Sequence, residues 1–144
     1  MGPDDRFDAT IRSATILAQA RAGNWGTAAH DINDLAAAHG PAGIQILCMG
    51  LADTLVIHQD GFARDNEVSV PLWVDEDGNA SEADAVARHE IRWAGRFVAA
   101  RAAGDTDACR ALWDSITGED EFRANVCGLL EVAATTLNAI GAPA

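Results

Sequence analysis

Residues 41–58 read PAGIQILCMGLADTLVIH, a run that is apolar on almost all sides when it is wound as a helix. A helix with so little polar surface usually lies at the centre of its domain. We therefore expect an all-α fold in which this helix is covered by its neighbours. The apolar side chains that define it are Ile44, Ile46, Leu47, Leu51, Leu55 and Val56.

Two more helices are predicted upstream of this run. The first covers roughly residues 3–22 and is followed by a glycine that stops it. Asn24 is a good cap for the second helix, which carries one apolar face. Gly40 and Pro41 then supply a C-terminal glycine and a proline for the first turn of the central helix. Residues 1–58 are thus expected to form three helices.

Residues 59–80 break the helical pattern. Apolar and other residues alternate there, which predicts a short extended segment. Proline has no N–H donor, so a strand at this place is expected at a sheet edge or as an isolated arm. The alternating residues are Val68, Val70, Leu72 and Val74 on one side, and Ser69, Pro71 and Trp73 on the other.

Three further helices are predicted in residues 81–144. Ser81 followed by Asp84 is a variant of the capping box, and it should open a helix that runs to about Ala103. A short amphipathic helix follows Gly104, and a second glycine break precedes the last helix. The core face expected for that last helix is Phe122, Val126, Leu129, Leu130, Ala133, Leu137 and Ile140.

The two ends of the chain share a plan. Residues 20–24 (ARAGN) and 100–105 (ARAAGD) are similar, and each is followed by a short helix, a glycine break and a long apolar helix with a cysteine. A length of 144 residues fits one domain. We predict a six-helix bundle of two pseudo-symmetric three-helix halves, 1–58 and 81–144, joined by the arm at 59–80.

The phrase from Arg92-Trp93-Ala94-Gly95-Arg96 to Ala103-Gly104-Asp105 resembles uncharacterised small helical proteins of actinobacteria and their phages. The resemblance covers roughly the last 60 residues and is carried by Ala, Arg and Gly. It implies a helical fold and no activity.

Charge and cysteine content narrow the classes of partner and compartment. The formal net charge of −12 repels nucleic-acid phosphate, so direct DNA or RNA binding is not expected. Three cysteines without C-x-x-C spacing indicate free thiols in a reducing compartment. The longest apolar stretch, 44–57, is too short to span a bilayer, and residues 1–8 lack a signal-peptide pattern. We expect a cytoplasmic protein without membrane contact.

A basic row lies on the predicted fourth helix. Arg88, Arg92 and Arg96 recur every four residues, and guanidinium groups in such a row can grip phosphate or carboxylate groups. The alternative is internal pairing, because Asp84 precedes Arg88 by the spacing of a helical ion pair. These three arginines are the candidate ligand- or partner-binding residues.

Residues 75–86 contain a candidate calcium loop. Asp75, Asp77, Asn79 and Ser81 stand at positions 1, 3, 5 and 7 of a loop, where Ca²⁺ sites place oxygen ligands. Glycine is at position 4 rather than 6, however, and position 12 is Val86 instead of a glutamate. A solvated turn is the alternative, and no other metal or cofactor site is expected, because the four histidines lack metal-ligand spacing.

Trp73 is the candidate partner-binding residue of the arm. If the alternating valines and Leu72 pack inward, Trp73 faces outward, and exposed tryptophans are enriched at contact hot spots. The alternative is that Trp73 folds back over its own domain.

The sequence holds no G-x-S-x-G, Walker or G-x-G-x-x-G motif, so we name no catalytic residues and expect no enzyme. We predict a protein-interaction or regulatory module that self-associates, most simply as a homodimer. Two alternatives remain. One is a sensor or enzyme for a small anionic ligand, with a pocket between the halves. The other is an acidic inhibitor that imitates nucleic acid.

Overall fold

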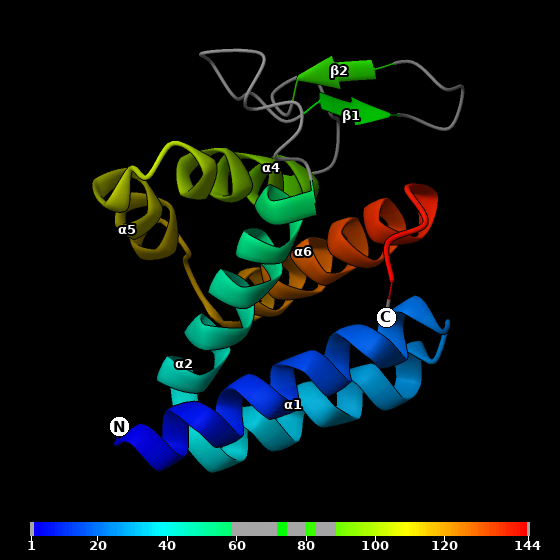
Figure 1. The fold of residues 1–144 in the computed structure, drawn as a ribbon. Coiled ribbons are helices and arrows are strands. Elements are labelled where there is room, and N and C mark those ends of the chain that lie inside the picture. Colours follow the sequence, from blue (N-terminus) through cyan, green and yellow to red (C-terminus); the bar gives the residue numbers. More distant parts are fainter. Residues whose placement is uncertain (1, 59–71, 75–79, 83–88, 144) are drawn as a thin grey trace.

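The computed structural model describes residues 2–58, 72–74, 80–82 and 89–143. These residues form five helices and two short strands (Figure 1). In chain order they are α1 (Pro3–Arg21), α2 (Trp25–His58), β1 (Leu72–Val74), β2 (Ala80–Glu82), α4 (His89–Ala102), α5 (Thr106–Asp114) and α6 (Glu119–Ala139). The predicted helical fold class is confirmed.

α1 and the first half of α2 form an antiparallel pair at one end of the molecule (Figure 1). Pro3 opens α1, and acidic residues occupy its first turn, where the helix dipole favours negative charge. Gly23 reverses the chain with a φ of +83°, a conformation that glycine adopts without strain. Asn24 directly precedes α2 as predicted, and its carbonyl accepts from the N–H of Ala28 at 3.0 Å, while its side-chain amide donates to Oε1 of Gln19 at 2.9 Å.

α2 bends at the position that the sequence indicates. Gly40 has a φ of +63° and a ψ of −157°, so the backbone leaves the helical conformation there, and Pro41 begins the second half. Figure 1 shows the first half beside α1 and the second half crossing the molecule toward α4. The bend therefore separates a peripheral segment from a central one.

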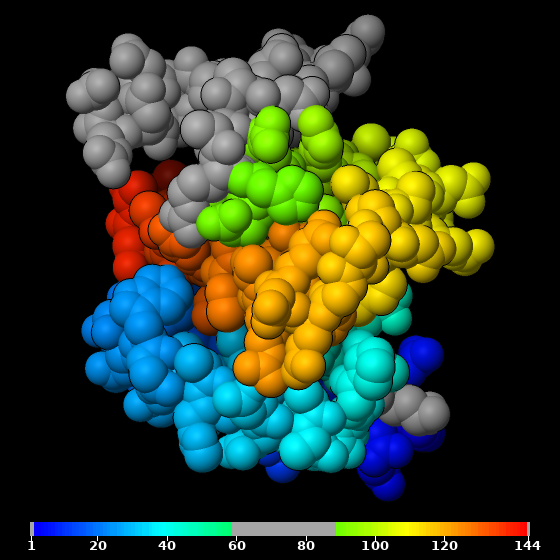
Figure 2. Space-filling view, turned by 180° about the vertical axis from the view of Figure 1, so that it is seen from behind, coloured from blue at the N-terminus to red at the C-terminus, as the bar shows by residue number. Residues whose placement is uncertain are grey.

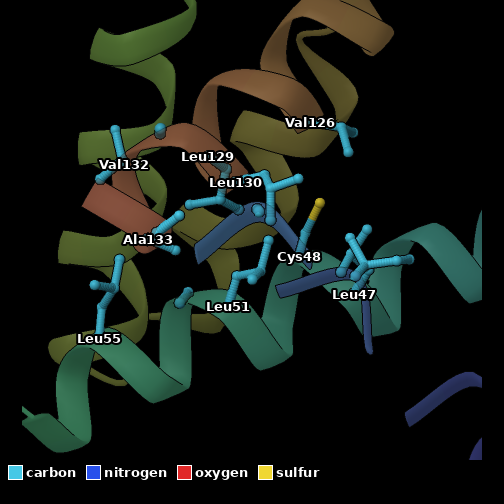
Figure 3. Packing of buried hydrophobic residues seen from close by; sticks show 14 of the residues in the cluster. Leu47, Cys48, Leu51, Leu55, Val126, Leu129, Leu130, Val132 and Ala133 are labelled. Atoms are coloured by element: carbon cyan, nitrogen blue, oxygen red, sulfur yellow. The ribbon is translucent and has the colours of Figure 1, made fainter. Parts of the chain in front are cut away.

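The core lies where the second half of α2 meets α6. Figure 3 shows apolar side chains from these two segments pointing toward each other. This confirms that the run at 41–58 contributes a central face. The labelled core residues are Leu47, Cys48, Leu51 and Leu55 from α2, and Val126, Leu129, Leu130, Val132 and Ala133 from α6.

α4 and α5 complete the core from the other side. The rings of Trp93 and Phe97 are stacked with centroids 5.2 Å apart, and both side chains are buried. The indole of Trp93 donates to the carbonyl of Leu112 at 2.9 Å, which ties α4 to α5. From behind, α5 (yellow) lies beside α4 (green), and the start of α6 (orange) lies over the first half of α2 (Figure 2).

The segment between the helical parts differs from the prediction at one point. β1 pairs antiparallel with β2, and Trp73 is opposite Ser81 in the register. The extended prediction is confirmed for 72–74, whereas residues 68–71 lie outside the described residues. The helix predicted to open at Ser81 is wrong, because the backbone there pairs with β1 and α4 begins at His89.

By length and composition α2 could cross a membrane, so the expectation that its apolar stretch is too short is wrong; among the described residues it is the one such helix. Its most apolar 18-residue window has a mean hydropathy of 1.5. Core helices share this property, and Leu47, Leu51 and Leu55 of α2 are buried in the core.

Candidate functional site

A hollow with a volume of about 840 Å³ lies among α1, the second half of α2 and the end of α6. Its size falls in the range of small-molecule sites. Most of the lining is apolar or small, and two arginines stand at its edge. The lining includes Thr10, Ala14, Leu17, Ala18 and Arg21 from α1, Ile46, Met49, Gly50, Asp53, Thr54 and His58 from α2, and Leu137, Asn138 and Arg101 from α6 and α4.

Arg101 at the hollow is neutralised by an acidic partner. Its Nε donates to Oδ1 of Asp53 at 2.8 Å, and its Nη2 donates to Oδ2 of the same carboxylate at 2.6 Å. These hydrogen bonds raise the pKa of the Arg101 guanidinium. The two-point geometry fixes the end of α4 against the second half of α2.

Arg21 at the hollow has only neutral partners. Its Nε donates to Oδ1 of Asn138 at 3.0 Å, and its other nitrogens donate to the carbonyls of Ala142 and Pro143. The amide of Asn138 in turn donates to the carbonyl of Arg21 at 3.0 Å. Arg21 therefore fastens the chain after α6 to the end of α1, and among the described residues no carboxylate pairs with its positive charge.

The two arginines hold equivalent places in the similar segments 20–24 and 100–105. Arg21 follows Ala20 and Arg101 follows Ala100, and each reaches a long helix from the other end of the chain. The similarity of the two segments is visible in the sequence, but neither arginine was among the predicted site residues. The matching positions of Arg21 and Arg101 in these segments are the sequence signal that could have identified them.

A second feature is the outward face of α1, formed by Phe7, Ile11, Ala14 and Ala18. Phe7 is 68% exposed and Ile11 is 50% exposed. The opposite side of the helix supplies the buried Ala9 and Ile16, so α1 is apolar on both sides. In Figure 1, α1 lies at the near edge of the molecule with no described helix in front of it.

Charged groups hold the start of α1 to the end of the first half of α2. Nε2 of His39 lies 2.6 Å from Oδ2 of Asp8, and Nε of Arg12 donates to the same oxygen at 2.8 Å. His39, then Arg12, lowers the pKa of the Asp8 carboxyl. His39, near the bend of α2, thus contacts a carboxylate on the neighbouring helix.

The predicted arginine row is not part of the hollow. Arg92 is half-buried on α4, and Arg96 is exposed and has a partner. Neither lines the hollow, and Arg88 lies outside the described residues. Asp75, Asp77 and Asn79 also lie outside them, while Ser81 lies in β2 and Trp73 in β1 without a described side chain.

The possible metal ligands and the thiols of the described residues are dispersed. No group of three or more His, Cys, Asp and Glu side chains gathers in this part of the chain. The three cysteines are free, and burial raises the pKa of the Cys48 thiol to about 12. Cys127 is exposed as a residue, yet desolvation also raises the pKa of its thiol. No activated thiolate results.

Comparison with protein-family models, curated proteins and solved structures finds no match. The function of the chain therefore has to be inferred from its own residues. Those that the structure describes offer an apolar outward face on α1 and, next to it, a hollow where the guanidinium of Arg21 has no described acidic partner.

Proposed function

We propose that this chain is a non-enzymatic protein-interaction module that self-associates through the outward face of α1. The observation that carries the proposal is the exposure of Phe7 and Ile11, which stand four residues apart on one side of the helix. Isolated exposed apolar residues are common on protein surfaces, whereas contiguous ones mark interaction sites. Burying each of these two side chains in an interface contributes about 1.5–3 kcal/mol.

The test is a pair of matched charge variants, Ala18→Glu and Ala37→Glu. Both alanines are exposed and helical, but Ala18 belongs to the outward face of α1 whereas Ala37 lies on α2. Light scattering coupled to size exclusion should give a dimer for the wild type and for Ala37→Glu, and a monomer for Ala18→Glu. Equal masses for the two variants would contradict the proposal.

The hollow supports a second candidate function, the binding of a small amphipathic anion. Arg21 offers a positive charge that no acidic side chain of the described residues pairs with, beside apolar walls that include Leu17 and Met49. Decanoate and decyl phosphate should then raise the melting temperature, and uncharged decanol should not. An Arg21→Gln variant should lose the response to both anions. Equal responses to all three probes would exclude an anion site.

We further propose the finer architecture of six helices in two pseudo-symmetric halves. The bend at Gly40 divides α2 into two helical parts and so supports a count of six. α1 contacts α2 and α6, and α4 contacts the same two helices. The hydrogen bonds agree with this pattern, because Arg21 at the end of α1 binds α6 and Arg101 at the end of α4 binds α2.

We also propose a cytoplasmic location and kinship with the small helical actinobacterial and phage proteins that residues 92–105 resemble. Three free cysteines support a reducing compartment. The net charge of −12 supports a protein partner over a nucleic acid.

A further inference from the structure

We infer that two copies pair through their α1 helices in an antiparallel orientation and in one register. In this register, the number of a residue in one copy and the number of the residue that it faces in the other copy add up to 25. The inference rests on the proposed self-association and adds the geometry of the contact. It follows from the order of large, small and charged residues along the outward side of α1.

The outward side of α1 follows a heptad spacing. Its residues are separated alternately by three and four positions, which is the spacing of a and d sites in a helix pair. Apart from half-buried Arg21, all of them are exposed, and the buried residues Ala9 and Ile16 fall at f sites on the opposite side. The a and d sites are Asp4, Phe7, Ile11, Ala14, Ala18 and Arg21.

Size complementarity selects the antiparallel orientation. The large residues Phe7 and Ile11 stand in the first half of α1, and the small Ala14 and Ala18 in the second half. In an antiparallel pair each a site faces a d site, so Phe7 lies over Ala18 of the second copy and Ile11 over Ala14. Large residues then meet small ones in every apolar layer, as close packing requires. A parallel pair would instead stack Phe7 on Phe7 and Ala18 on Ala18.

Charge complementarity selects the same register. Asp4 at one end of α1 faces Arg21 of the second copy, and no acidic side chain of the described residues pairs with Arg21 within one chain. At the flanking e sites, Asp8 lies diagonally across from Thr15 of the second copy, so no like charges meet there. The antiparallel arrangement also sets the positive end of each helix dipole beside the negative end of the other.

The hollow lies beside this contact. Ala14, Ala18 and Arg21 line the hollow as well as the outward side of α1, and Gly50 and Met49 lie on its α2 wall. Phe7 of the second copy reaches Ala18 at the edge of the hollow. The apolar wall therefore extends the surface that this ring contacts.

The experiment cross-links two single-cysteine variants with a short bis-maleimide. Cys109 and Cys127 are first replaced by Ala and Ser, and the buried Cys48 is kept. Ile11→Cys and Ala14→Cys chains, one of them isotope-labelled, are mixed at high concentration. The expected product is an 11–14 link, formed at least about tenfold more than 11–11 or 14–14 links. An Ala37→Cys chain is the control and should give background cross-linking.

The outcomes separate the register from the proposed function. Predominant 11–11 and 14–14 links would overturn the antiparallel register. A dimer in sedimentation without enriched 11–14 links would overturn the register and leave self-association standing. A monomer at all concentrations would overturn both.

A layer swap gives a second test that does not depend on cysteines. Ile11→Ala removes the large residue from the two layers that pair residues 11 and 14, and Ala14→Ile overfills these two layers, so each single variant should weaken dimerisation by about tenfold or more. The double variant restores one isoleucine and one alanine in each of these two layers. Its dissociation constant should return to within about threefold of the wild-type value. Additive weakening in the double variant would contradict the pairing of residues 11 and 14.

Discussion

Arg101 on α4 holds Asp53 on α2 through two hydrogen bonds of 2.8 and 2.6 Å, and the pair joins residues 48 positions apart. Asp53 is 48% exposed, so solvent screening limits what the pair contributes. Arg101→Ala should lower the free energy of unfolding by about 1 kcal/mol in urea denaturation. The control is Arg123→Ala, whose pair with Glu119 is more exposed and should contribute nothing measurable. Equal losses in both variants would contradict this account.

Two helical glycines should respond to alanine in opposite directions. A Cβ at Gly128 would lie 3.0 Å from Cγ of Glu90 and 3.1 Å from its carbonyl oxygen, so the α4–α6 contact would have to open. Gly128→Ala should cost about 1–3 kcal/mol. Nothing lies within 4 Å of a Cβ at Gly50, so Gly50→Ala should gain about 0.5–1 kcal/mol from helix propensity. Thermal unfolding of both variants checks the sign, and a stabilising Gly128→Ala would contradict the packing.

Asp8 should make stability depend on pH in the acid range. Its pKa is lowered in the folded chain by His39 and Arg12, so the unfolded chain binds its proton more tightly. The stabilisation is complete above the ordinary carboxyl pKa of about 4 and disappears as the pH falls through the folded value. Asp8→Asn should therefore be less stable than the wild type at neutral pH, with a gap that closes in strong acid.

Urea denaturation of both proteins between neutral and strongly acidic pH measures this gap. Asp34→Asn is the matched control, because Asp34 also lies beside a histidine, His30, at 3.4 Å on the surface. The stability difference between the wild type and Asp34→Asn at neutral pH should be smaller than that between the wild type and Asp8→Asn. A gap for Asp8→Asn that grows toward acid would reverse the sign and refute the account.

Asn125 is a polar side chain in the core. It is fully buried in α6, and neither atom of its amide has a hydrogen-bond partner among the described residues. Asn125→Leu should therefore raise the free energy of unfolding by about 1 kcal/mol, because it removes an unsatisfied group. Asn138→Leu is the contrast and should be destabilising, since Asn138 exchanges two hydrogen bonds with Arg21. A loss of stability in Asn125→Leu would show that an ordered water satisfies the amide.

The features of the fold that depend on a few neighbouring residues could be predicted from the sequence. The bend at Gly40 follows from a glycine and a proline in sequence, and both act within one turn. The core face of α6 follows from periodicity, and Val126, Leu129 and Leu137 are buried. Periodicity does not show where neighbouring helices end, which is why Ile140 on the same predicted face is 51% exposed.

Ser81 shows how a tertiary contact overrides a local signal. Its side chain and the following acidic residues favour a helix start, yet its backbone pairs with Trp73 on β1. The pairing partner lies eight residues away, so a capping pattern that spans four residues carries no information about it.

The candidate site could be predicted only in part. A search for basic rows finds residues that share one helix, such as Arg92 and Arg96. The hollow instead gathers Arg21 and Arg101 from helices that are distant in sequence. Likewise, Phe7 and Ile11 fit an ordinary amphipathic helix until the structure places the opposite side of α1 in the core.

Sedimentation equilibrium of the unmodified chain tests self-association most directly. The mass of one chain is 15.1 kDa. Between about 1 and 200 μM, the weight-average mass should rise from that of one chain toward that of two, as expected for a dissociation constant in the micromolar range. A mass that stays at 15.1 kDa over the whole range would contradict the proposal that the outward face of α1 binds a second copy.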